Sequence, residues 1–168
     1  DILVKRYATQ LDYYKRTLEK ITGTEVSEVY LYSFALDKEI DYVAEAFDDK
    51  KPDTVYIGGG TPTTLEPAEL DRLLGKIEAS FDLDNIREFT VEAGRADSIT
   101  AEKLLVLKKH KVSRISVNPQ TMNEETLKFI GRRATAQQTI EAYKLARSLG
   151  FDNINMDIIL GLPGENED

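Results

Sequence analysis

The sequence contains no cysteine, and this absence restricts its chemistry more than any other feature. Without a thiol, the 168 residues form no disulfide and supply no thiolate ligand to a metal. The only histidine, His110, stands beside Lys109 and Lys111 late in a predicted helix, which indicates a solvated, structural residue. Ser-His-Asp and Cys-His arrangements are absent, and no spacing of candidate ligands predicts a metal site.

Two further absences narrow the classes of function. No apolar run approaches the roughly 20 residues of a membrane-spanning helix, and no signal peptide opens the chain, so we expect a cytoplasmic protein with no membrane partner. A net charge of −8 argues against a basic nucleic-acid-binding surface. The length and the hydrophobic content of 41% are those of one soluble globular domain with a real core.

The chain is organised around residues 54–64, TVYIGGGTPTT, in which a short apolar strand leads directly into three glycines. Consecutive glycines cost backbone entropy, which a chain accepts where the backbone passes close to another group or needs φ > 0. At the end of a strand, such a turn is where α/β proteins bind ligands, although a tight turn without a ligand is the alternative. The turn is neither a P-loop nor a dinucleotide fingerprint, because no Gly-Lys-Ser/Thr follows and the glycines are contiguous.

Predicted strands and helices alternate along the chain. The strands cover 29–32, 55–57, 88–93, 114–118 and 153–160, and helices begin near 36, 67, 100, 123 and 135. This order predicts an α/β fold in which βα units build a parallel sheet. Five strands are too few for a closed barrel of about 250 residues, so we expect a partial parallel (β/α) barrel that is incomplete in this chain, as part of a larger protein.

Local signals place the helix ends. Thr100 and Asn123 are expected N-caps, and Thr135 forms a capping box with Gln138. The leucines expected to face inward from the helix that follows Thr100 are Leu104, Leu105 and Leu107.

Residues 2–22 read as one amphipathic helix with apolar positions three and four residues apart. We assign residues 1–24 to this N-terminal helix, from a preceding domain, and residues 25–168 to the five-stranded partial barrel. A helix packed on the next domain is favoured over a coiled-coil seam.

Polar residues stand at the strand ends. Glu92 ends the third strand, Gln120 follows the fourth, and Asp157 lies within an apolar run of the fifth. A carboxylate in such a run is costly unless it is paired, so these residues predict a polar pocket at the carboxyl ends of the strands. For each residue the alternative is a purely structural role. Arg132 and Arg133 are either surface residues or a grip for a ligand carboxylate.

Four stretches together resemble the radical S-adenosylmethionine (SAM) superfamily, in particular the oxygen-independent coproporphyrinogen III oxidases. They are TVYIGGGTPTTL (54–65), EFTVEAG (88–94), RISVNPQTMNEETLKFIGRRAT (114–135) and NINMDIILGLPGE (153–165). The resemblance covers residues 29–165 and is greatest to the coproporphyrinogen dehydrogenase-like branch. It implies an incomplete barrel, a [4Fe–4S] cluster held by a three-cysteine loop after the first strand, and SAM bound at that cluster.

The resemblance also implies roles for individual residues. The methionine end of SAM would meet the glycine turn, an arginine would pair with its carboxylate, and acceptors would take its amino group and ribose hydroxyls. A tyrosine would precede the cysteine loop. The residues of the glycine turn are Gly59, Gly60 and Thr61, and the arginine is Arg132. The acceptors are Glu92, Gln120 and Asp157, and the tyrosine is Tyr32. The implied partners are a porphyrinogen substrate and a reductant such as flavodoxin or ferredoxin.

The departures from the family pattern concern the metal. Where the cysteine loop belongs, Ser33 and Phe34 run into a helix, so no metal ligand is assigned and catalysis is not expected of the chain as it stands. Ala134 replaces a histidine of many relatives. Three explanations stay open: a longer protein whose loop is left out of this sequence, an engineered deletion, or a natural cluster-free relative.

The resulting hypothesis is a radical SAM oxidoreductase that decarboxylates coproporphyrinogen III propionates in haem biosynthesis. One alternative is a haem chaperone-like relative, and another is a non-enzymatic module that binds SAM or a porphyrin. An ordinary barrel enzyme that uses Glu92 and Asp157 for acid–base chemistry is a further alternative.

Overall fold

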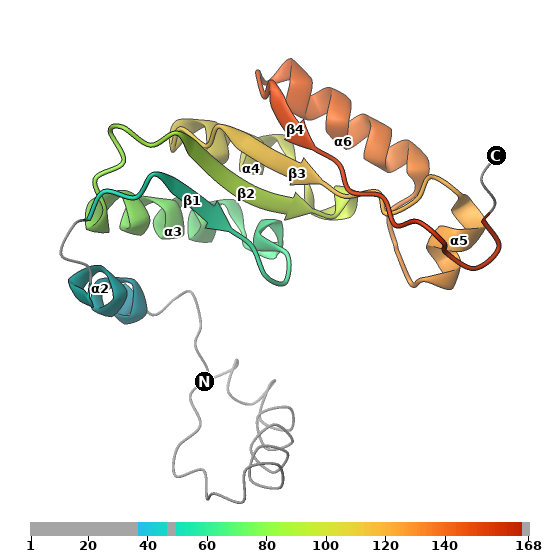
Figure 1. Ribbon diagram of the computed structural model, residues 1–168. Helices are drawn as coiled ribbons and strands as arrows, with labels where there is room; N and C mark the ends of the chain where they lie inside the picture. The colour runs from blue at the N-terminus through green and yellow to red at the C-terminus, as the bar shows by residue number, and fades with distance from the viewer. Residues whose placement is uncertain (1–36, 47–49, 166–168) are drawn as a thin grey trace, which may run out of the picture. The chain divides into compact units, whose positions relative to one another are not determined.

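The computed structural model describes residues 37–46 and 50–165 (Figure 1). The predicted helix 2–22, the strand 29–32 and Tyr32 lie outside the described residues, and so does the junction where the cysteine loop was expected. These features, and the division of the chain near residue 24, therefore stay predictions.

A parallel sheet of four strands, in the order β1-β2-β3-β4, forms the centre of the described part (Figure 1). The strands are β1 (Thr54–Ile57), β2 (Glu88–Gly94), β3 (Arg114–Val117) and β4 (Asn153–Asn155). In the register, Thr54 pairs with Glu88, Thr90 with Arg114, and Arg114 in turn with Asn153. The strand order follows the chain order, which confirms the prediction of α/β architecture with a partial parallel barrel.

Helical segments connect the strands, and their ends follow the capping signals of the sequence. Thr100 accepts a hydrogen bond from the Lys103 amide, Asn123 caps α5, and Thr135 forms a reciprocal capping box with Gln138. The segments are α2 (Asp37–Ala46), η1 (Pro62–Thr64), α3 (Pro67–Ser80), η2 (Ala96–Ser98), α4 (Ala101–Lys109), α5 (Glu124–Phe129) and α6 (Ala136–Ser148). None of the described helices has both the length and the hydrophobicity to cross a membrane.

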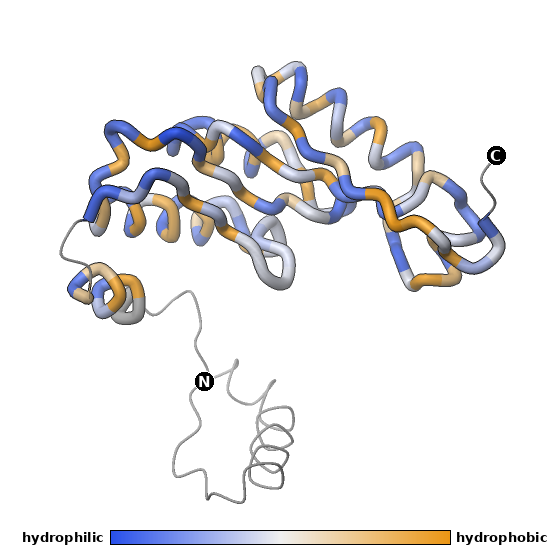
Figure 2. The backbone as a smooth tube through the Cα atoms, viewed as in Figure 1, coloured by the Kyte–Doolittle hydropathy of each residue, from blue (hydrophilic) through white to orange (hydrophobic). Residues whose placement is uncertain are grey.

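The two faces of the sheet differ in polarity because side chains alternate along each strand. In β2, Phe89, Val91 and Ala93 are buried in one hydrophobic core with Leu74 of α3 and Leu104 of α4. Hydrophilic and hydrophobic positions alternate along the backbone in Figure 2. The helices therefore cover the apolar face, and the residues between the core positions face the other way.

The buried side of α4 differs from the prediction at one position. Leu104 and Leu107 are fully buried, as expected, but the prediction for Leu105 is wrong, since it is 55% exposed. Residues three apart lie on one face of a helix, whereas the neighbouring residue is rotated away by about 100°. In α6, the buried positions include Ala142 and Ala146, whose small side chains let the helix pack against the sheet.

The last strand is shorter than the predicted 153–160, since β4 ends at Asn155 and residues 156–160 are exposed. Its partner β3 is interrupted at Pro119, which has no N–H to donate. Pairing resumes at an isolated bridge, where the Gln120 amide donates to the Asp157 carbonyl over 3.0 Å. The ladder is therefore broken just where the polar residues stand, which corrects the expectation that Asp157 is buried in a strand.

His110 is structural, as predicted, but it is not solvated. Its side chain is 6% exposed, with Nε2 2.9 Å from Asp71 Oδ1 and Nδ1 2.8 Å from Glu78 Oε2. The Lys109 ammonium and His110 both hydrogen-bond to Asp71 and hold the pKa of that carboxyl below its usual value. The ring therefore joins α3 to the end of α4, before β3 and away from the carboxyl ends of the strands.

Candidate functional site

The face of the sheet opposite the hydrophobic core carries a row of polar side chains. On this face of β2 stand Glu88, Thr90 and Glu92, and Glu92 pairs in register with Ser116 of β3. A network crosses three strands at the amino end, where Arg114 donates to Glu88 and to Asn155 over 3.2 Å each. Hydrogen bonds from Thr90 and then from Arg114 hold the pKa of Glu88 below its usual value. Glu88 is thereby paired, whereas Glu92 stands nearer the glycine turn.

The glycine turn combines both properties for which consecutive glycines are used. Gly59 and Gly60 have φ values of +83° and +62°, in the left-handed region that disfavours side chains. At Gly58 the constraint is space, since a Cβ would lie 2.5 Å from Tyr56 Cε1 and 2.9 Å from Glu92 Oε2. The turn therefore brings bare backbone close to the Glu92 carboxylate at the carboxyl end of β1.

Thr61 completes this first group of candidate residues. Gly94 has a φ of +61°, and a Cβ built on it would lie 3.6 Å from Thr61 Cγ2 and 3.9 Å from Glu92 Cγ. The structure thus brings together Gly59, Gly60, Thr61 and Glu92, all named from the sequence. Two glycines absent from that prediction, Gly58 and Gly94, provide the space between them.

Gln120 and Asp157 form a second group through their backbones. Gln120 has a φ of +65°, which is uncommon for a residue with a side chain and frequent at functional sites. Its amide donates to the Asp157 carbonyl, and its carbonyl accepts from Ile159 over 2.8 Å. The Asp157 carboxylate is exposed and accepts a hydrogen bond of 2.7 Å from Asn155 Nδ2.

Arg132 lines a small cavity next to the segments that follow β2 and β3. The cavity is also lined by Arg95, Asp97, Asn118 and Arg133. Arg95 donates two hydrogen bonds to Asp97, of 3.0 and 2.6 Å, and these hold the pKa of Asp97 below its usual value, with a smaller effect from Arg133. Three arginines against one carboxylate leave a positive charge there, which suits an anionic ligand group.

The candidate residues therefore share one edge of the sheet without forming one contact network. Within residues 37–46 and 50–165, no hydrogen bond or ion pair joins the side chains of Glu92, Gln120 and Arg132. The arrangement is one of separate groups: a glycine turn with a carboxylate, a strained glutamine beside an exposed aspartate, and a basic cavity. A ligand that contacts all of them must carry both cationic and anionic groups.

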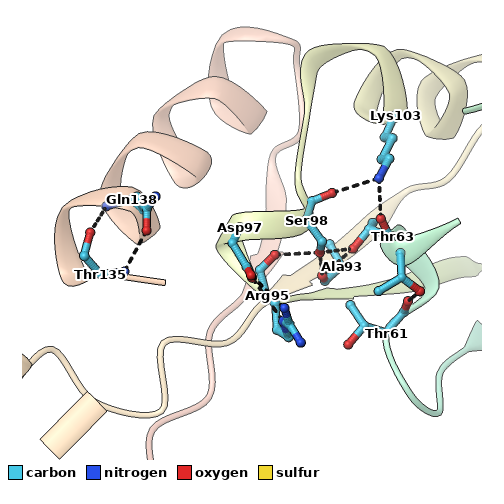
Figure 3. Close-up of polar contacts among 10 residues, drawn as sticks. Thr61, Thr63, Ala93, Arg95, Asp97, Ser98, Lys103, Thr135 and Gln138 are labelled. Carbon is cyan, nitrogen blue, oxygen red and sulfur yellow. Dashed lines mark hydrogen bonds and ion pairs between the residues drawn. The ribbon is translucent and has the colours of Figure 1, made fainter. Parts of the chain in front are cut away.

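Two residues that support the turn were missed in the sequence. Thr63 is fully buried, and Lys103 is 8% exposed with its amine 2.6 Å from the Thr63 carbonyl (Figure 3). Forty residues separate them, so no local pattern joins them. The one available signal was a lysine in the first turn of a helix, where the helix dipole disfavours a cation.

Comparisons with known proteins indicate the family of the chain. A model of the Radical SAM superfamily matches residues 13–168. A relative from Bacillus subtilis (strain 168), oxygen-independent coproporphyrinogen-III oxidase-like protein HemZ, is 57% identical over 118 residues, which are 70% of this chain and 24% of that protein. The heme chaperone HemW of Lactococcus lactis is 38% identical over 144 residues, which are 84% of this chain and 38% of that protein.

Among solved structures, coproporphyrinogen III oxidase HemN from Escherichia coli, described as a radical SAM enzyme, matches with a TM-score of 0.70. It has 29% identity over 78% of this chain and 30% of that chain. An archaeal Elp3 matches with a TM-score of 0.59 at 19% identity, which shows the fold alone. The chain thus spans 24% to 38% of the length of the two curated relatives and of HemN.

Proposed function

The chain belongs to the radical SAM superfamily, and from this premise we propose that its strand ends bind S-adenosylmethionine within a haem-biosynthetic oxidoreductase. The proposed reaction is the oxidative decarboxylation of coproporphyrinogen III propionates. The observation that carries the proposal is the glycine turn, in which a side chain on Gly58 would collide with Tyr56 and with the Glu92 carboxylate.

The donor set along this edge fits the chemistry of the proposed cofactor. The main-chain amide groups of Gly59, Gly60 and Thr61 suit the methionine end, and Glu92 suits its amino group. The basic cavity at Arg132 suits the carboxylate, because a guanidinium binds a carboxylate with two parallel hydrogen bonds. The ribose hydroxyls are assigned to Gln120 and Asp157, and Tyr32 stays a proposed contact from outside the described residues.

The [4Fe–4S] cluster does not fit the residues present. The 168 residues contain no cysteine, so we assign them no cluster ligand and no step that depends on the cluster. When bound and given one electron by a reductant, S-adenosylmethionine would supply the chemistry that removes a hydrogen atom from a propionate. The part assigned to this chain is to bind and orient that cofactor.

The proposed partners follow from the same premise. They are a porphyrinogen substrate and a reductant such as flavodoxin or ferredoxin, and the proposed compartment is the cytoplasm.

A second candidate function is haem binding without decarboxylation. It is favoured by the likeness to the heme chaperone HemW from Lactococcus lactis, which is 38% identical over a larger share of this chain than HemZ. Anaerobic turnover of the full-length protein distinguishes the two. Formation of protoporphyrinogen from coproporphyrinogen III supports the oxidase, and bound haem with no such product supports the chaperone.

The binding proposal is tested by exchanging Glu92 for glutamine in the full-length protein. A hydrogen bond to a charged group contributes about 1.5–3 kcal/mol, so we expect Glu92→Gln to weaken SAM binding by about tenfold or more in equilibrium titration. The matched control is Glu88→Gln, on the same strand and the same face but paired with Arg114. Equal affinities of wild type and Glu92→Gln would refute the assignment.

A further inference from the structure

The position of Lys103 is unfavourable for a lysine side chain for two reasons. It is the third residue of α4, where the amino end of the helix dipole repels a cation, and its side chain is almost wholly buried, which is rare for lysine. A residue that costs stability at its own position needs a compensating contact elsewhere. The ammonium group of Lys103 makes these compensating contacts.

The Lys103 ammonium donates hydrogen bonds to two main-chain carbonyls. The Thr63 carbonyl is 2.6 Å away and the Ser98 carbonyl 3.4 Å away, and within the described residues no ion pair involves Lys103 (Figure 3). Thr63 belongs to η1, directly after the glycine turn, and Ser98 belongs to η2, directly after β2. One buried cation thus joins the segments that follow two neighbouring strands.

Thr63 tightens the same junction through its hydroxyl. Its Oγ1 donates to the Ala93 carbonyl over 2.7 Å and lies 2.6 Å from Ser98 Oγ. Ala93 stands between Glu92 and Gly94, the two β2 residues that lie beside the glycine turn. We call Lys103, Thr63 and these hydrogen bonds the Lys103–Thr63 clamp.

We propose that Lys103 is a positioning residue for S-adenosylmethionine, because the Lys103–Thr63 clamp fixes the glycine turn against the end of β2. The identity of the ligand rests on the proposed function, whereas the clamp rests on the geometry alone. Gly59 and Gly60 have wide conformational freedom and no side chains, so the turn has few contacts of its own. Its amides keep one direction because the residues on either side are held by β1 and by the clamp.

The test compares two lysines of one helix in the full-length protein. Lys103→Met removes the buried ammonium at similar volume. Lys108→Met is the matched control, because Lys108 Nζ also donates to a main-chain carbonyl, that of Gly150 at 2.8 Å, but away from the glycine turn. The readouts are amide hydrogen exchange of residues 55–65 without ligand, and the equilibrium Kd for S-adenosylmethionine.

We expect Lys103→Met to speed exchange of residues 55–65 and to raise the Kd, each by about tenfold, the usual effect of losing a charged hydrogen bond. Lys108→Met should change each readout by less than about twofold, in line with the small effect of exposed pairs. Since Lys103 touches no reacting atom, its loss should raise the KM for S-adenosylmethionine and leave kcat within about threefold.

Thr63→Val is measured beside Lys103→Met, so that a folding failure of one variant still leaves a decisive result. It keeps the side-chain shape and removes the hydroxyl, and we expect the same direction of change in both readouts. Unchanged exchange and unchanged Kd in the folded variants would overturn the inference while the proposed function stands. A wild-type protein that binds no S-adenosylmethionine would overturn the proposed function, and the exchange data would still decide whether the clamp holds the turn.

Discussion

Substituting Gly58 by alanine separates an effect on ligand binding from an effect on stability. Gly58 is not among the glycines with positive φ, so its backbone accommodates alanine. The new Cβ would lie 2.5 Å from Tyr56 Cε1 and 2.9 Å from Glu92 Oε2. Ordinary contacts begin near 3.5 Å, so the Tyr56 ring must move by about 1 Å and the Glu92 carboxylate by about half as much.

The cost of this retreat to stability is small. Overpacking a core costs about 1–3 kcal/mol, but Tyr56 is 61% exposed, and the Glu92 atom in question is at the far end of a flexible side chain. Replacing glycine at a compatible φ gains about 0.4–1 kcal/mol through the unfolded state, so the two effects offset within about 1 kcal/mol. The carboxylate of Glu92, by contrast, leaves the position from which it would meet the ligand. We expect SAM affinity to fall by about tenfold or more.

The assay is SAM titration together with urea denaturation of the full-length protein. The control is Gly75→Ala in α3, where the Cβ would make an ordinary contact of 3.7 Å with His110 Cε1. That variant should gain about 0.5–1 kcal/mol of stability, as alanine does in a helix, and should keep its affinity. The reasoning is refuted if Gly58→Ala binds SAM as tightly as wild type, or if it loses several kcal/mol of stability.

Two further predictions concern groups away from the turn. His110→Ala leaves the Asp71 and Glu78 carboxylates without their buried partner. The free energy of unfolding, measured by urea denaturation, should therefore fall by about 1–3 kcal/mol. An unchanged denaturation midpoint would contradict the structural role of His110. Arg95 lowers the pKa of Asp97 in the folded protein. The pair therefore stabilises the folded protein at pH values above the pKa of Asp97 in the unfolded chain, which is about 3.9. This stabilisation is lost as the pH falls through the lower pKa of Asp97 in the folded protein. Asp97→Asn should therefore flatten the decline in stability below about pH 5, and an unaltered pH profile would argue against the pair.

The parts of the fold that local chemistry determines could be predicted from the sequence. Thr100, Asn123 and the Thr135–Gln138 pair cap their helices because their side chains satisfy amides only two or three residues away. The parallel order of the strands follows from their alternation with helices. The glycine turn was predictable for the same reason, since φ > 0 is a local demand.

Features that depend on distant residues were not predictable. The end of β4 depends on the left-handed Gln120 and on Pro119, more than thirty residues earlier, because they interrupt the partner strand. His110 is buried by carboxylates of α3, and Lys103 finds its partner forty residues back at Thr63. In each case the sequence shows one residue, whereas the contact requires the assembled sheet and helices.

The most direct test of the central claim is a crystal structure of the full-length protein with S-adenosylmethionine. The account predicts the methionine end of the ligand within hydrogen-bond distance of the amides of Gly59, Gly60 or Thr61. Its amino group should lie at Glu92 and its carboxylate at Arg132. A ligand bound elsewhere, with the glycine turn and Glu92 free of contact, would contradict the account.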